Sequence, residues 1–122
     1  MSLRLVAIRG ATTVDANTVE AMTDRVQEML LTILDRNGVH HDDVVSALFT
    51  ATTDLTAAFP ATAARGVGFG DIPLICASEI EVPKSTPLCV RVMLHVYSAR
   101  SRADIRHVYL HGAQGLRDDL PT

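Results

Sequence analysis

The 122-residue sequence contains no tryptophan, and three phenylalanines and two tyrosines are its only large aromatic residues. Its two cysteines are too few for the disulfide framework of a small secreted domain, so we expect reduced thiols in a cytoplasmic protein. No apolar run approaches the roughly 18 residues that a membrane-spanning helix requires. The chain also opens without a basic-then-apolar leader and cleavage site, which argues against secretion and against a membrane protein.

The chain also has no excess of basic residues. Its 11 lysines and arginines are outnumbered by 14 aspartates and glutamates, which gives a net charge of −3. This charge excludes a global field that would attract nucleic acid or an anionic membrane. Any anion site must therefore be built from a few local arginines. Hydrophobic residues make up 48% of the chain, which argues against disorder. The length suits one domain spanning residues 1–122.

The clearest element is a helix over residues 18–36. Its apolar residues recur at helical spacing and form one stripe, while charged residues occupy the opposite side. Asn17 or Thr18 can cap the first turn. The pair Asn37 and Gly38 ends the helix, since both tolerate the left-handed backbone of a helix end.

Short apolar runs predict strands at 3–8, 48–52, 73–77 and 88–97, with a weaker strand at 106–111. Gly10 is expected to end the first strand, and Pro60 to begin a short helix that ends at Arg65. The order is strand, long helix, strand, short helix and three strands. It predicts an α+β fold in which a mixed sheet packs with one long and several short helices.

The best strand, 88–97, has apolar residues on both of its faces. Leu88 and alternate residues up to Val96 share one face, and Cys89 to Tyr97 alternate on the other. One long helix can cover only one face of the sheet. Oligomerisation is therefore the natural way to cover the second face.

Several short motifs resemble nucleotide-binding, metal-binding or nucleophilic sites but lack the spacing or the partners that such sites need. The glycines at 66–70 follow a helix and open a strand, the reverse of a dinucleotide-binding loop. Residues 40–43 (HHDD) are interpreted as a polar helix start. His107 and His111 are four apart on a strand-like segment, so we expect surface or interface histidines rather than metal ligands. Cys76 alone, with no base placed beside it, is interpreted as a core cysteine.

The arginines carry more information. Arg9 ends the first apolar run beside Gly10, where a ligand can approach the backbone. Arg91 interrupts the most apolar strand and needs an anionic partner there. Each alone is typical of a surface cation. Together with Arg65 and Arg117 they indicate a small polyanionic ligand, because guanidinium groups bind carboxylates in a bidentate manner.

Six segments, in order and at near-constant spacing, resemble motifs of the trimeric, monofunctional chorismate mutases. They are 8–14 (IRGATTV), 53–61 (TDLTAAFPA), 73–79 (PLICASE), 90–93 (VRVM), 105–110 (IRHVYL) and 116–120 (LRDDL). The resemblance covers almost the whole chain. It implies the pseudo-α/β-barrel class with bacillus-type, ferredoxin-like topology, and a homotrimer with a barrel-like core and active sites between subunits. It also implies the Claisen rearrangement of chorismate to prephenate in phenylalanine and tyrosine biosynthesis, without metal or organic cofactor.

The resemblance also implies roles for individual residues. Arg91 is expected to place its cation at the ether oxygen of the substrate. Arg9 and Tyr109 are expected to bind or flank a carboxylate, and Glu79 and Cys76 to meet the region of the ring hydroxyl. These expectations make Arg91, Glu79, Cys76 and Arg9 the predicted catalytic residues.

Further residues are implied as the wall of the site. They are Ile75, Ala77 and Ser78, with Phe59, Ala61 and Arg65 from a neighbouring subunit, and Leu116 and Arg117 on a closing tail. Two alternatives remain at this point. One is a trimeric imine-deaminase-like enzyme, which would act on small keto acids and leave chorismate unchanged. The other is a non-catalytic module that would bind prephenate without turnover.

Overall fold

A single mixed sheet of five strands forms the frame of the protein. The structure is a computed structural model and describes residues 2–116. The strand order across the sheet is β3-β2-β4-β1-β5. The strands are β1 (Arg4–Thr13), β2 (Val44–Ala51), β3 (Leu74–Ser78), β4 (Cys89–Ser98) and β5 (Val108–Leu110). β4 runs antiparallel to β1 and β2, whereas β5 and β3 run parallel to β1 and β2.

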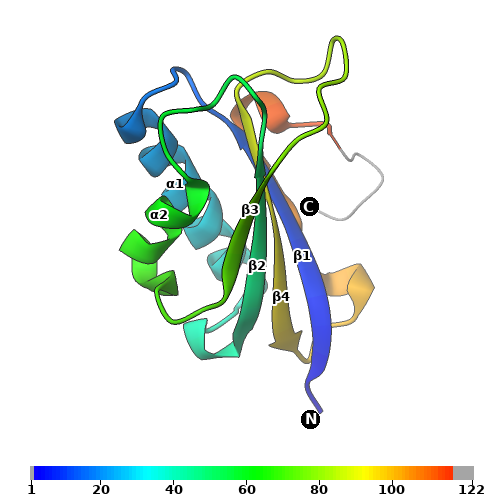
Figure 1. Cartoon of the computed structure of the whole chain (residues 1–122). Helices are drawn as coiled ribbons and strands as arrows, with labels where there is room; N and C mark the ends of the chain where they lie inside the picture. The colour runs from blue at the N-terminus through cyan, green and yellow to red at the C-terminus, as the bar shows by residue number, and fades with distance from the viewer. Residues whose placement is uncertain (1, 117–122) are drawn as a thin grey trace.

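Both α-helices lie on one side of this sheet (Figure 1). They are α1 (Val19–Asn37) and α2 (Pro60–Ala64), and α2 continues into a π-type turn, η2 (Arg65–Phe69). Three 3₁₀ turns complete the described elements: η1 (His41–Asp43), η3 (Arg102–Asp104) and η4 (His111–Ala113). The expected α+β fold and the expected order of its strands and two helices are confirmed. No helix within residues 2–116 is long and apolar enough to cross a membrane.

The limits of α1 follow the predicted caps. The Thr18 hydroxyl accepts a hydrogen bond from the Ala21 backbone at 3.1 Å, and Gly38 ends the helix with a φ of 59°. The predicted apolar stripe faces the sheet, and its buried members are Met22, Val26, Met29, Leu30 and Ile33.

The expectation that Gly10 ends the first strand is wrong, because β1 continues through it to Thr13. A Cβ at position 10 would lie 2.6 Å from Cδ1 of Ile33 and 3.2 Å from Cγ1 of Val92. The glycine therefore lets α1 pack directly on the strand. The group that approaches its backbone is the helix, not a ligand.

Besides β1, two further strands differ in length from their apolar runs. β2 begins at Val44, four residues before the predicted run, because it pairs with the long β4 as far as Val96, with an irregularity between Val44 and Ser46. β5 is confined to Val108–Leu110, since it pairs with β1 over three residues only. Strand length here is set by the partner strand.

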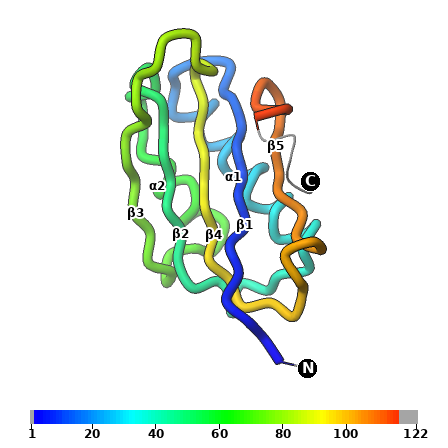
Figure 2. The backbone as a smooth tube through the Cα atoms, turned by 90° about the vertical axis from the view of Figure 1, so that its right-hand side faces the viewer, coloured from blue at the N-terminus to red at the C-terminus, as the bar shows by residue number. Residues whose placement is uncertain are grey.

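The two faces of the sheet are unequally covered. Val90, Val92, Leu94 and Val96 of β4 are buried with the helices, as predicted. The opposite face, here called the open face, is covered by no helix of residues 2–116 (Figure 2). It exposes large apolar residues from four strands, namely Leu5, Leu48, Ile75 and Tyr97.

Candidate active site

Glu79 is held at the end of β3 by its backbone and its side chain. Its backbone N–H donates to the carbonyl of Ala51 at 2.9 Å, which extends the pairing of β3 with β2 by one step. The hydroxyl of Thr50 donates to Oε1 of Glu79 at 3.1 Å. Because Thr50 pairs with Arg91 across β2 and β4, the carboxylate is directed toward the arginine.

Arg91 forms an ion pair with this carboxylate. Its Nε lies 2.6 Å from Oε1 of Glu79, and both side chains are largely withdrawn from solvent. Nε is buried and has no hydrogen-bond partner among the described residues, so the contact is an ion pair. The anionic partner that Arg91 needs therefore comes from the end of β3. The family resemblance indicated Glu79 only as a substrate contact, and this pairing was not predicted.

A cavity of about 230 Å³, here called the cation cavity, surrounds this pair on the open face. Its lining residues are Arg9, Leu48, Thr50, Glu79, Arg91, Val92 and Met93. Two guanidinium groups and one carboxylate give this lining a net positive charge. It is therefore suited to an anion with an apolar body.

A second cavity, here called the edge cavity, lies between β3 and the segment that leads into α2, and has a volume of about 590 Å³. Among the predicted site residues it is lined by Phe59, Cys76, Ala77 and Ser78. Phe59, at the N-cap of α2, is 71% exposed. An apolar ring so exposed is typical of a contact surface.

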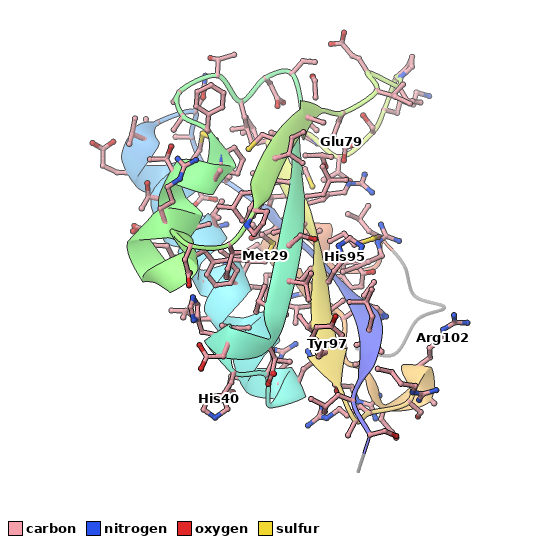
Figure 3. The ribbon with its side chains drawn as sticks, turned by 60° about the horizontal axis from the view of Figure 1, so that its bottom comes forward. Met29, His40, Glu79, His95, Tyr97 and Arg102 are labelled. Carbon is pink, nitrogen blue, oxygen red and sulfur yellow. The ribbon has the colours of Figure 1, made fainter. Side chains whose placement is uncertain are left out.

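Cys76 and Glu79 thus line different cavities of one chain. Cys76 pairs with the core residue Phe49 and packs against the helix side of the sheet. Glu79 lies at the upper end of β3 and faces the open side, as do His95 and Tyr97 (Figure 3). An odd spacing along an extended chain places side chains on opposite faces, and this signal was available in the sequence. That both residues meet the same part of a ligand stays a prediction.

Tyr109 lies on the open face at the end near η4. It pairs with Ala11, which pairs with Arg91 in turn, and it packs with Cys89, Ala113 and Leu116. Its hydroxyl is buried and has no hydrogen-bond partner among residues 2–116. Burial also raises the pKa of the neighbouring Cys89 thiol, so this thiol is neutral at pH 7.

The remaining predicted residues are dispersed. Ile75 is exposed on the open face and borders a small apolar hollow with Leu48. Ala61 is buried in α2, and Arg65 is exposed at its C-terminal end. Arg117 lies outside the described residues. Nowhere between residues 2 and 116 do three or more histidine, cysteine or acidic side chains gather as they would around a metal ion.

Two polar contacts of the site were not predicted. Ser46 and Thr50 are four residues apart in β2 and so share one face of the strand, which could have marked Thr50 as an open-face residue. His107, expected at a surface or interface, is only 9% exposed. Its Nδ1 accepts the backbone N–H of Arg9 at 2.9 Å. No signal in the sequence identifies this contact, because it depends on how β5 is placed beside β1.

Comparisons with known proteins identify the family of the chain. The family model for chorismate mutase type I matches residues 5–120. The chain is 43% identical over 116 residues to the chorismate mutase AroH of Thermus thermophilus, covering 94% of this chain and 95% of that protein. It is 40% identical over 114 residues to AroH of Bacillus subtilis, covering 93% and 90%. A solved chorismate mutase from Clostridium thermocellum superposes with a TM-score of 0.87 at 48% identity, covering 89% of this chain and 97% of that one. The chain belongs to the chorismate mutase type I family.

Proposed function

We propose that the cation cavity and the edge cavity are two halves of one chorismate mutase active site, which is completed where copies of the chain meet in a homotrimer. The substrate is chorismate and the product prephenate, so the enzyme is an isomerase of aromatic amino acid biosynthesis. The observation that carries the assignment is the Arg91–Glu79 ion pair in a positively charged cavity. The whole chain serves as one domain.

The reaction explains why a fixed cation is needed. In the rearrangement a C–O bond breaks while a C–C bond forms within one molecule, so no nucleophile and no proton transfer are required. Negative charge grows on the ether oxygen in the transition state. A cation fixed at that oxygen stabilises the transition state more than the substrate, and this difference lowers the barrier.

Arg91 is suited to supply that cation. Glu79 holds the guanidinium through Nε, and Thr50 fixes Glu79 in turn. The guanidinium is therefore oriented before the substrate arrives, which is the condition for effective electrostatic catalysis. Arg9 shares the cavity and provides a second positive charge for a substrate carboxylate.

The other half of the site has to come from a neighbouring copy. Phe59 and Cys76 lie at the edge cavity and not in the cation cavity of the same chain. The open face exposes Leu5, Ile75 and Tyr97 to solvent in a single copy. A trimer that covers this face would remove these apolar groups from water and bring the two halves together. Arg65, Leu116 and Arg117 would then form the rim.

Loss of chorismate and formation of prephenate, both followed by absorbance, test the assignment, with oligomeric size measured by light scattering. We expect turnover by a trimer, a loss of at least about 10²-fold in kcat for Arg91→Ala, and full activity for Arg36→Ala, an exposed arginine of α1. Binding of prephenate without turnover, or turnover of small keto acids alone, would contradict the assignment. An active monomer would contradict the shared site.

A further inference from the structure

His107 makes a long-range contact with the backbone of a site residue. Its Nδ1 accepts the N–H of Arg9 at 2.9 Å, although 98 residues separate the two in the chain. The imidazole is almost fully buried. The hydrogen bond itself is partly buried, and a bond withdrawn from water fixes two distant segments more firmly than an exposed one.

The topology explains why a side chain is used at this point. β5 begins at Val108, which pairs with Gly10 of β1. Arg9 precedes that pair, beyond the reach of the three-residue β5 ladder. The imidazole of His107 supplies the acceptor for the N–H of Arg9, and so extends the attachment of β1 by one residue.

The contact also lies beside the Arg9 side chain. Arg9 lines the cation cavity with Arg91, and it lines a larger hollow of about 620 Å³ with His95, Arg102 and His107. Arg9 is thus situated between two cavities, and the direction of its guanidinium depends on how its backbone is held.

We propose that His107 is a positioning residue for Arg9: its imidazole fixes β1 so that the guanidinium of Arg9 is presented to a substrate carboxylate. This inference rests on the proposed function, which gives Arg9 that role. Nδ1 must carry no proton to accept the N–H bond, so the bonded ring is the neutral imidazole protonated on Nε2. Losing the bond should weaken substrate binding and leave the cation at the ether oxygen intact.

Three substitutions distinguish the loss of the hydrogen bond from the loss of the volume of the imidazole ring. His107→Leu removes the acceptor, His107→Asn keeps an oxygen near the place of Nδ1, and His107→Gln keeps a polar group near the place of Nε2. His95→Leu is the matched control, because His95 borders the same hollow and bonds Ser46 instead of Arg9. Light scattering verifies that each variant assembles as the wild type does.

We expect His107→Leu and His107→Gln to raise KM about 3- to 10-fold, the size of one hydrogen bond, with kcat nearly unchanged. His107→Asn should restore KM, and His95→Leu should leave it unchanged. Amide exchange of the Arg9 N–H should be faster in His107→Leu and slow again in His107→Asn. On an Arg9→Ala background, His107→Leu should add no further loss, because the two residues act as one unit.

The inference would be overturned if His107→Leu raised KM by the same factor in the wild type and on the Arg9→Ala background. An unchanged KM in His107→Leu, when Arg9→Ala raises it, would overturn the inference too, and this result would leave the proposed function standing. An unchanged KM in Arg9→Ala would overturn the carboxylate role of Arg9 and the inference with it. If His107→Leu fails to fold, the comparison of His107→Asn with His107→Gln decides, and equal KM values for these two would overturn the inference.

Discussion

Glu79 and Arg91 meet across an intervening strand. Glu79 follows β3 and Arg91 belongs to β4, and β2 lies between these strands. Thr50 of β2 pairs with Arg91 and donates its hydroxyl to Glu79. The orientation of the guanidinium therefore depends on residues of β2 and β4 and on the residue that follows β3.

Because of this orientation, we expect Arg91 to be the residue least replaceable in the chain, even by lysine. Lysine keeps the charge but loses the planar fork and the Nε that meets Glu79. We expect Arg91→Lys to lower kcat about 10²- to 10³-fold, with a much smaller rise in KM. Replacement by citrulline should lower kcat similarly, because it removes charge and keeps shape. Steady-state kinetics check this expectation, and near-full kcat in Arg91→Lys would contradict it.

Thr50 lines the cation cavity and should influence catalysis through the hydroxyl that holds Glu79. Thr50→Val keeps the shape of the side chain and removes the hydroxyl that holds Glu79. We expect kcat to fall by about tenfold, close to the lower limit for one hydrogen bond to a charged group, because the hydroxyl acts on Arg91 only through Glu79. Thr50→Ser keeps a hydroxyl and should retain most of the activity. Equal rates for the valine and serine variants would show that the hydroxyl is irrelevant.

Gly10 should tolerate no side chain, because α1 packs on it. Gly10→Ala would place a Cβ 2.6 Å from Ile33, and we expect a loss of about 1–3 kcal/mol in the free energy of unfolding. The shorter Ile33→Val should recover part of that loss in the double variant. Gly70→Ala is the control, since nothing lies within 4 Å of its added Cβ and its φ is −66°. Urea unfolding at one protein concentration measures the free energy of unfolding of the wild type, Gly10→Ala, Gly70→Ala and the double variant Gly10→Ala/Ile33→Val. Equal stability of the two single alanine variants would refute the packing explanation.

Asp54 should stabilise the fold in a pH-dependent way. The Thr52 hydroxyl and the Leu88 backbone N–H donate to its carboxylate and hold its pKa below the ordinary value of 3.8. The folded state therefore prefers the ionised form. The stabilisation is complete above the unfolded pKa and is lost as pH falls through the lower folded pKa.

Asp54→Asn should consequently reduce the free energy of unfolding at pH 7 by less than about 1 kcal/mol, because the carboxylate is exposed. The difference from wild type should shrink when the pH is lowered below about 4. Asp24→Asn, at an exposed position of α1, is the control for the loss of one negative charge. Denaturation curves between pH 3 and pH 7 test this, and a difference that grows toward acid pH would have the wrong sign.

The two cysteines should react at different rates with a thiol reagent. Cys89 is buried and its thiol pKa is raised, so we expect modification only after unfolding. Cys76 is partly exposed at the edge cavity and should react in the native protein, more slowly when prephenate is bound. Cys76→Ala should abolish the native reaction. A fast reaction that survives in Cys76→Ala would contradict the assignment.

The sequence predicted those parts of the fold whose signals are local. The caps and apolar stripe of α1 and the alternation in β4 belong to single segments, and the structure agrees with both. Gly10 was misinterpreted because a glycine that ends a strand and a glycine that admits a helix look alike in sequence. Only the packing of Ile33 against it distinguishes the two.

The site was predicted as a set of residues rather than as an arrangement. Arg9, Glu79 and Arg91 do line one cavity, as the family resemblance suggested. The Glu79–Arg91 pair and the His107–Arg9 bond depend on which strands are neighbours, and composition and spacing carry no information about that. The placement of Cys76 on the other face could have been deduced from its odd spacing to Glu79.

The separation of the two cavities determines how much activity remains in a cell that makes both an intact and a defective version of this chain. With the site divided as proposed, each active site takes its arginine from one subunit and its Phe59 wall from another. A subunit that lacks Arg91 then inactivates one active site of its trimer. It still supplies an intact Phe59 wall to the neighbouring active site. Defective chains that assemble normally would lower activity in simple proportion to their abundance, so such alleles would behave as recessive.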